Sequence, residues 1–377
     1  MRRRRAALAL ALGLLLALWT VEARAQDAPQ GSWRAAALVE QSTGRVLFSE
    51  NGDEELPMAS TTKIMTALCA IESGRLDETV EIDSRMVGVE GSSIYLEAGE
   101  RLTVEELTYG LLLRSGNDAA EAIALTLGGS LEGFAQIMND RAAALGLAHT
   151  HFVNPHGLPA EGHYTSALDL AAITCAAYAY EPFRRIVSTQ YAVIPWTGHD
   201  YDRAMRNKNK LLASYPGANG VKTGYTKAAG RCLVSGAERD GMQLIAVTLN
   251  APDMWGDAAA LLDYGFAQYE MREVVPMGAV VGSVPCAQAE DGEIAVCAAR
   301  AGRLPLQSQE EAFVRLVLPE SVESPVAQGQ VLGYAILGTG EEELARIPLC
   351  AAEQVVRPQW DYGQSLLRVL RGWMAAG

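Results

Sequence analysis

Ser60 and Lys63 lie three residues apart in the stretch PMASTTKIMTAL, which spans residues 57–68. If a helix starts here, residues with this spacing share one face, so the lysine amine can reach the serine hydroxyl. The serine also lies near the positive helix end, which favours developing negative charge. The pair can then be a nucleophile and its base, provided that the lysine amine is neutral. Taken alone, however, such a pair is more often a helix cap followed by a solvated charge.

Two more short motifs follow along the chain. Residues 115–117 are Ser-Gly-Asn, which alone predicts a turn because all three are turn residues. Residues 222–224 are Lys-Thr-Gly, which alone predicts an exposed lysine at a strand edge. Each motif by itself favours the structural interpretation, but the three in this order favour one shared site.

The hydrophobic pattern predicts the elements that would position these motifs. Two β-rich runs flank a turn at residues 42–44, and helices are expected at about 60–72, 103–113, 118–127, 131–145 and 167–180. Thr103 and Glu106 form a capping-box pattern at the second of these helices. Strands are expected at 191–196, 231–239 and 242–250, followed by a helix at 255–269. This order predicts one α/β domain in which the first hairpin joins the late sheet.

The last quarter of the chain has a different pattern. From about Val274, short apolar runs separated by Gly and Pro predict a small all-β domain. Cys286 and Cys297 flank an expected hairpin turn, and a disulfide between them is left open because spacing alone does not establish a bridge. The chain has six cysteines and no C-x-x-C pair, which argues against a zinc ribbon or a thioredoxin-type site.

Both ends of the chain indicate export and membrane contact. Residues 1–25 combine a basic start, a short apolar run and an A-x-A site, which is typical of a cleaved signal peptide; the alternative is a transmembrane anchor. Residues 356–377 place apolar and aromatic side chains on one helical face and arginines on the other, which predicts a helix at a membrane surface. The alternative is a helix docked on the protein itself. Between the ends, a catalytic domain is expected at 26–272 and a β-rich domain at 273–355.

Composition limits the partners of the protein. The formal net charge of −14 argues against nucleic acid, so recognition of an anion must be local. The five histidines show no H-E-x-x-H spacing, and they are interpreted as ordinary loop residues. The sequence therefore predicts neither a metal nor a cofactor.

S-x-x-K, S-x-N and K-T-G in this order are the signature of penicillin-recognising serine enzymes. The chain resembles the low-molecular-mass penicillin-binding proteins that are serine D-alanyl-D-alanine carboxypeptidases. Longer stretches share the resemblance, including GSSIYLEAGERLTVEELTYGLLLRSGNDAAEAIA, THFVNPHGLP and GVKTGYTKAAGRCLVSGAERDGMQLIAVTLNA. It covers residues 33–270 densely and implies a β-lactamase/transpeptidase-like domain, in which helices flank an antiparallel sheet.

The resemblance implies a role for each motif. Ser60 would form an acyl-enzyme with the penultimate D-alanine of a peptidoglycan stem peptide, and Lys63 would accept its proton. Ser115 would relay a proton toward the leaving D-alanine, while Asn117 would hold the substrate amide and orient the base. Backbone N–H groups of Ser60 and Tyr225 would form the oxyanion hole.

The third motif would hold the terminal carboxylate of the substrate. Lys222 would supply positive potential, Thr223 would donate a hydrogen bond, and Gly224 would let the strand pass close to the substrate. Tyr225 stands where several relatives carry histidine, which should change pocket shape rather than chemistry. Lys208 stands where some relatives place an arginine that binds the carboxylate, and a lysine offers no bidentate fork.

The resemblance implies a D-alanyl-D-alanine carboxypeptidase that is acylated by β-lactam antibiotics. The two ends of the chain predict that it lies outside the cytoplasm, attached peripherally to the outer face of the cytoplasmic membrane. One alternative is a serine β-lactamase, which is disfavoured because the second motif is S-G-N and no E-x-x-L-N-like element follows it. D,D-endopeptidase action on cross-links is a second alternative. A non-catalytic penicillin-sensing or wall-binding module is a third, disfavoured because every polar side chain that the chemistry needs is present.

Overall fold

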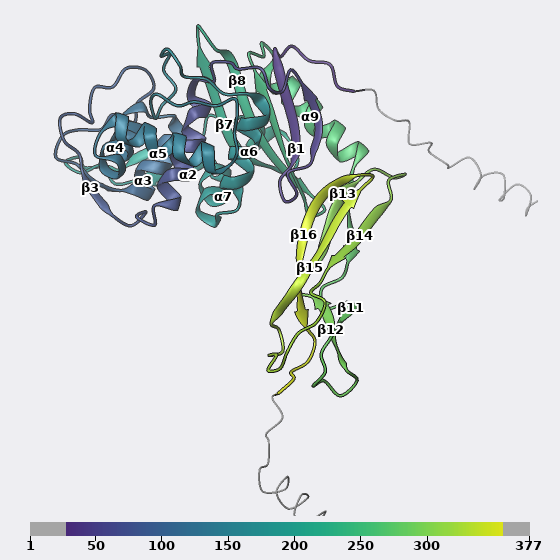
Figure 1. The fold of residues 1–377 in the computed structure, drawn as a ribbon. Coiled ribbons are helices and arrows are strands. Elements are labelled where there is room, and N and C mark those ends of the chain that lie inside the picture. Colours follow the sequence, from purple (N-terminus) through teal and green to yellow (C-terminus); the bar gives the residue numbers. More distant parts are fainter. Residues whose placement is uncertain (1–27, 357–377) are drawn as a thin grey trace, which may run out of the picture.

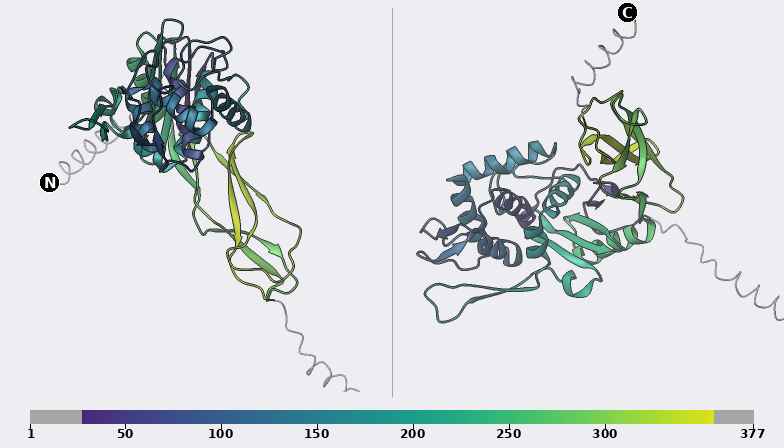
Figure 2. Two further views of the ribbon diagram at one scale, coloured as in Figure 1. Left: turned by 90° about the vertical axis from the view of Figure 1, so that its left-hand side faces the viewer. Right: turned by 90° about the horizontal axis from the view of Figure 1, so that it is seen from below.

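The computed structural model describes residues 28–356. The predicted signal peptide (1–25) and all but the first residue of the predicted terminal helix (356–377) lie outside the described residues. An α/β unit leads into a narrow unit of strands that extends away from it (Figures 1 and 2). None of the helices within residues 28–356 is long and apolar enough to cross a bilayer.

The α/β unit is built on a five-stranded antiparallel sheet with the order β2-β1-β9-β8-β7. Its strands are β1 (Ala35–Glu40), β2 (Val46–Glu50), β7 (Ala218–Thr226), β8 (Gly230–Arg239) and β9 (Met242–Leu249). The first hairpin pairs with β9, as the sequence predicts, and β7 forms one edge of the sheet. The predicted α/β fold class is thereby confirmed.

The central strands are apolar at successive positions, so both faces of the sheet are apolar. On β1, Ala35, Ala37 and Val39 belong to the core built with the helices α2 (Lys63–Glu72) and α6 (Ala167–Tyr178). Ala36 and Leu38 instead pack with α9 (Met254–Gln268). Successive strand residues point to opposite faces, so a strand that is apolar throughout must be covered on both sides. The result is a sheet between α9 and a helical layer (Figure 1).

The helical layer carries two of the three motifs. Its helices are α2 (Lys63–Glu72), α3 (Val104–Tyr109), α4 (Asn117–Gly128), α5 (Leu131–Ala144), α6 (Ala167–Tyr178) and α7 (Glu181–Ser188); α8 (Leu211–Ser214) and α9 (Met254–Gln268) follow β6 and β9. The capping box at Thr103 and Glu106 is present at α3. The helix expected at 103–113 is present, but its second half is π-helical rather than α-helical (Gly110–Arg114), with Ser115 as the capping residue.

Several short elements differ from the expectations. The strand expected at 191–196 is β5 (Tyr191–Ile194), which pairs with β6 (Arg203–Arg206) in a separate hairpin instead of joining the main sheet. Helix α7 and strands β3 (Thr79–Glu81), β4 (Arg101–Thr103) and β6 have no counterpart among the predictions. Each is short, so its sequence carries little periodic signal.

The second unit is all-β, as expected. A five-stranded sheet has the order β11-β12-β16-β15-β14, and β10 pairs with β13. The strands are β10 (Glu270–Val275), β11 (Val280–Pro285), β12 (Glu293–Ala298), β13 (Gly302–Leu306), β14 (Ala312–Val317), β15 (Val331–Thr339) and β16 (Glu342–Ala351). All six cysteines are free: Cys286 is buried beside Gln288, and Cys297 lies opposite Cys350 rather than Cys286.

Arg45 joins the two units. It lies in the turn between β1 and β2, directly before β2. Its Nη1 donates to a carboxylate oxygen of Glu310 at 2.8 Å and to the carbonyl oxygen of Pro305. Its guanidinium also stacks over Tyr269, 5.3 Å from the ring centroid. The arginine is only 8% exposed, so these contacts form in a shielded environment where charge-assisted hydrogen bonds are strong.

A loop at residues 154–158 packs directly against the turn that carries Ser60. Gly157 has a φ of +87°, and a Cβ there would lie 1.8 Å from the carbonyl oxygen of Ala59. Only glycine therefore fits this position, because both the backbone conformation and the space exclude a side chain.

We expect Gly157→Ala to destabilise the protein by about 3 kcal/mol or more, because the added methyl group displaces the turn at Ala59. Gly162→Ala is the matched control: its φ is +79°, but the nearest atom to a Cβ would be 3.8 Å away. It should cost only about 1 kcal/mol of backbone strain. Urea unfolding measures the free energy of unfolding of both variants. Equal losses of stability in the two variants would contradict the steric argument.

Candidate active site

Ser60 lies in a single 3₁₀ turn (Ala59–Thr62) that leads directly into α2. The turn begins at Ala59 in the left-handed region, with a φ of +50°. The hydroxyls of Thr61 and Thr62 donate back to the carbonyls of Met58 and Ala59, at 2.7 and 2.9 Å. Local hydrogen bonds of this kind hold a turn rigid, so the backbone that bears Ser60 has a defined conformation.

Lys63 is completely buried and points into the site. Its Nζ lies 3.1 Å from Ser60 Oγ, 2.7 Å from Asn117 Oδ1 and 2.6 Å from the carbonyl oxygen of His156. None of these three partners is charged. The first and second motifs therefore meet at one amine.

The environment of Lys63 favours the neutral amine. Burial is the main cause that lowers its pKa well below the usual lysine value, and the charges of Lys222 and Lys208 lower it further. The carboxylate of Asp118 acts in the opposite direction. A buried cation without a carboxylate partner loses its proton readily, which is what a general base requires.

The second motif lies between the π-helical turn and α4. Ser115 has a φ of +65° and is 3% exposed, and Asn117 is the first residue of α4. Besides its contact with Lys63, the side chain of Asn117 donates from Nδ2 to the carbonyl of Glu90 at 2.5 Å. Its backbone N–H donates to the carbonyl of Ser92 at 2.7 Å. Both ends of the Asn117 amide are thus fixed by the protein.

The third motif lies on the edge strand β7, beside the Ser60 turn. A Cβ on Gly224 would lie 3.1 Å from the backbone nitrogen of Ser60 and 3.0 Å from the carbonyl oxygen of Met58, so a side chain here would push the strand and the turn slightly apart. Lys222 is 2% exposed, which rules out the interpretation as an exposed strand-edge lysine. Tyr225, by contrast, has its side chain 66% exposed.

The amine of Lys222 has a strongly shifted pKa. Burial, and secondarily the charge of Lys208, lower it to about 7. Its Nζ donates to the carbonyl of Thr223 at 2.8 Å. Lys208 itself donates to Ser92 Oγ at 3.0 Å, and partial burial together with Arg114 lowers its pKa. Lys222 and Lys208 therefore supply the local positive charge of the site in an acidic chain, beside the neutral amine of Lys63.

Sequence reasoning missed the contributions of the histidines. His156 offers its carbonyl to Lys63, and its ring lies 3.4 Å from Glu121. His163 Nε2 lies 2.9 Å from Thr62 Oγ1, and its Nδ1 accepts the backbone N–H of Val153. Burial lowers the pKa of His156 to about 3 and that of His163 to about 4. The sequence Asn-Pro-His-Gly at residues 154–157 predicts a turn. That this turn places the carbonyl of His156 beside Lys63 depends on the tertiary structure.

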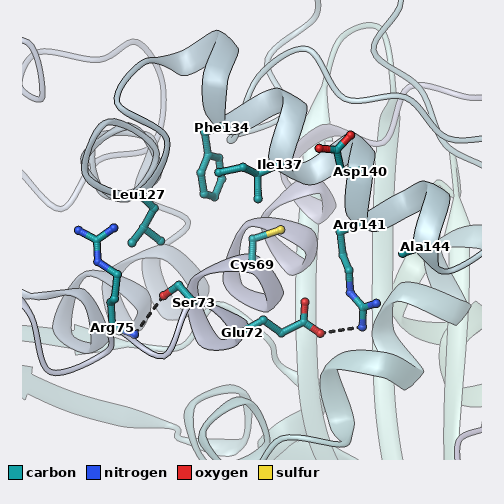
Figure 3. Close-up of a pocket in the computed structure, with 10 residues that line it drawn as sticks. All are labelled: Cys69, Glu72, Ser73, Arg75, Leu127, Phe134, Ile137, Asp140, Arg141 and Ala144. Carbon is teal, nitrogen blue, oxygen red and sulfur yellow. Dashed lines mark hydrogen bonds and ion pairs between the residues drawn. The ribbon is translucent and has the colours of Figure 1, made fainter.

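The opposite end of α2 borders a separate cavity of about 440 Å³. Cys69, Leu127, Phe134 and Ile137 give it an apolar wall, and Glu72 pairs with Arg141 at 2.7 Å at its edge (Figure 3). None of the motif residues lines this cavity. It is therefore distinct from the candidate active site.

The comparisons with known proteins agree with this geometry. The family model described as D-alanyl-D-alanine carboxypeptidase matches residues 22–253, and the model of the C-terminal domain of penicillin-binding protein 5 matches residues 269–357. The D-alanyl-D-alanine carboxypeptidase DacF of Bacillus subtilis is 34% identical over 333 residues, 85% of each chain. DacC of Escherichia coli is 31% identical over 356 residues, 89% of this chain and 86% of its own.

A solved structure extends the likeness to three dimensions. Penicillin-binding protein 5 from Haemophilus influenzae superposes with a TM-score of 0.72 at 26% identity, covering 88% of this chain and all of its own. Both units of the fold are therefore shared with a low-molecular-mass penicillin-binding protein. The chain belongs to the D-alanyl-D-alanine carboxypeptidase family of serine hydrolases.

Proposed function

We propose that Ser60 is the nucleophile of this carboxypeptidase and that Lys63 is its base. The observation that carries the proposal is the 3.1 Å contact between Ser60 Oγ and a completely buried lysine amine. A neutral amine can donate its two N–H groups to Asn117 and His156 and keep its lone pair for the serine proton. Ser60 Oγ then attacks the carbonyl carbon of the penultimate D-alanine of a peptidoglycan stem peptide.

The remaining groups act on the tetrahedral intermediate and on the leaving group. Backbone N–H groups of Ser60 and Tyr225 receive the oxyanion, which is supported by the close approach of β7 to the Ser60 turn. Ser115 passes the proton to the nitrogen of the leaving D-alanine, and the C–N bond breaks. Water then attacks the acyl-enzyme and regenerates Ser60. A β-lactam acylates Ser60 in the same way, with its leaving nitrogen still tethered.

The terminal carboxylate of the substrate is assigned to Lys222, Thr223 and Lys208. The two lysines lie near each other, since the charge of Lys208 lowers the pKa of Lys222. A protein of net charge −14 repels an anionic peptide at long range, so a small cationic site is needed to retain it. Asn117 Nδ2 donates one hydrogen to the carbonyl of Glu90, and its second N–H is the donor assigned to the substrate amide.

Ser60→Ala should lower D-alanine release by at least about 10⁴-fold and abolish acylation by penicillin, because no other nucleophile replaces the hydroxyl. Mass spectrometry of a pentapeptide substrate measures release, and intact-protein mass measures acylation. Ser73→Ala, at the far end of α2, should retain both activities. Release of D-alanine by Ser60→Ala at the wild-type rate would refute the assignment.

The kcat/KM for D-alanine release should fall above about pH 7, because Lys222 loses its charge there and no longer attracts the substrate carboxylate. For one deprotonation the fall is about tenfold per pH unit. Lys222→Arg stays charged at every pH, so the profile of that variant should lack this alkaline limb. An identical limb in the variant would show that Lys222 is not the group that titrates.

We further propose that the protein is exported and held at the outer face of the cytoplasmic membrane by residues 356–377. Support comes from the sequence: the signal-like residues 1–25 and the apolar face that includes Leu366, Leu370 and Trp373. An anchored enzyme of this kind would remain close to newly made peptidoglycan.

Deleting residues 359–377 should move the protein from the membrane fraction to the soluble fraction and leave D-alanine release unchanged, because the apolar face is removed and the catalytic unit is intact. Fractionation followed by penicillin labelling measures both properties. Membrane association that survives the deletion would contradict the anchor.

A further inference from the structure

A pocket of about 240 Å³ lies next to the proposed catalytic residues and is not used by the mechanism above. The loop after Ser92 and the β5–β6 hairpin enclose it, and its lining includes Ser93, Tyr95, Arg114, Trp196, Arg203 and Met205. Arg114 immediately precedes Ser115 in the chain. Ser93 follows Ser92, whose carbonyl accepts the N–H of Asn117 at 2.7 Å. Ile94, which also lines the pocket, lies beside Gly116 of the second motif, where a Cβ would come within 3.2 Å of it.

Arg114 gives this pocket a positive charge. The other arginine in the lining, Arg203, is neutralised by a buried ion pair with Glu100 at 2.9 Å. Arg114 makes a single weak hydrogen bond, from Nη1 to the carbonyl of Arg206 at 3.3 Å. Within residues 28–356 no carboxylate lies within ion-pair distance of it. An unpaired guanidinium in an acidic protein is available for an anionic ligand.

The loop that forms the opposite wall is held rigidly. Asp118, 1% exposed, accepts from the hydroxyl of Ser93 at 2.5 Å and from the backbone N–H groups of Ile94 and Leu96 at 3.1 Å. Tyr95 has a φ of +61°, a conformation that a bulky residue adopts only where its surroundings enforce it.

The side chain of Tyr95 is nevertheless 71% exposed. Its N–H donates to Ser93 Oγ at 2.7 Å, and its carbonyl accepts from Arg203 at 3.1 Å. Arg203 also stacks on Trp196, 4.4 Å from the ring centroid. The fold thus holds the exposed ring of Tyr95 at a pocket in which Arg114 is the unpaired charge. This combination suits a ligand that carries a carboxylate on a short aliphatic chain.

We propose that this pocket is an accessory subsite that binds a second carboxylate of the stem peptide, with Arg114 as its anchor and Tyr95 as its wall. The inference rests on the proposed carboxypeptidase function. A stem peptide contains dicarboxylic residues, so it carries carboxylates besides the terminal one. Lys222, Thr223 and Lys208 are assigned to the terminal carboxylate, and Arg114 is the cation of this pocket that has no carboxylate partner within residues 28–356. The subsite makes the enzyme selective for substrates in which that second carboxyl group is free rather than amidated.

The test compares two synthetic pentapeptides that end in D-Ala-D-Ala and differ only in whether the carboxyl group of their glutamate residue is free or amidated. Wild-type protein should show a kcat/KM at least severalfold higher for the free acid, expressed mainly in KM. Arg114→Gln should raise KM for the free acid by about tenfold, as expected for a lost charged hydrogen bond. For the same variant, the KM for the amidated peptide and the rate of penicillin acylation should stay within about twofold of the wild-type values.

Arg206→Gln is the matched control. Arg206 lies on the same hairpin, is exposed and lacks an acidic partner within residues 28–356, but it does not line the pocket. The variant keeps the backbone carbonyl that receives Arg114 and should retain the preference for the free acid. Tyr95→Ala provides a second variant, which should raise KM for the free acid severalfold and leave penicillin acylation unchanged.

Two results would overturn the proposal. Equal kcat/KM of wild-type protein for the two peptides would show that no second carboxylate is recognised. A fall in kcat of similar size for both peptides in Arg114→Gln would show that the arginine supports Ser115 and does not bind substrate. Failure of the proposed function is distinguishable, since wild-type protein would then release D-alanine from neither peptide.

Discussion

The buried amine of Lys63 is the group on which the arrangement of the catalytic unit depends. Removing an ammonium group from water costs several kcal/mol, so a lysine in this position either finds a counter-charge or becomes neutral. Its three partners, Ser60, Asn117 and the carbonyl of His156, are all uncharged. They come from three segments that are distant in the sequence. The Ser60 turn, α4 and the 154–158 loop must therefore all be in place before Lys63 has this uncharged environment.

The second constraint is the cationic site that the acidic chain builds around β7. The charge of Lys208 lowers the pKa of Lys222, and the charges of both lysines lower the pKa of Lys63. A substrate carboxylate would reverse this effect on Lys222 by pairing with it. Because β7 is an edge strand, a substrate can approach its free side in an extended conformation, beside Gly224 and the Ser60 turn. In the proposed mechanism, substrate binding at Lys222 and the charge state of Lys63 are thus linked through the same few charges.

Much of the fold could be predicted because its main elements are long and strongly patterned. The first hairpin, the late strands, α5, α6 and α9 are long apolar segments bounded by turn or capping residues, and Thr103 with Glu106 marks the start of α3. The errors lie in short elements. The π-helical turn at Gly110–Arg114 differs from an α-helix only in which carbonyls its N–H groups reach, and packing decides that choice. The hairpin of β5 and β6 likewise has too few residues for a periodic signal.

The sequence by itself determined the residue types of the site and their order: a serine and a lysine one turn apart, then Ser-Gly-Asn, then Lys-Thr-Gly. It also determined the family, because these motifs recur with long matching stretches around them. Only the tertiary structure decided that Lys63 and Lys222 are buried, that the carbonyl of His156 completes the environment of the base, and that Arg114 has no acidic partner within residues 28–356. The physical reason is that charge state and hydrogen bonding depend on burial and on neighbours from distant segments, which local sequence patterns do not encode.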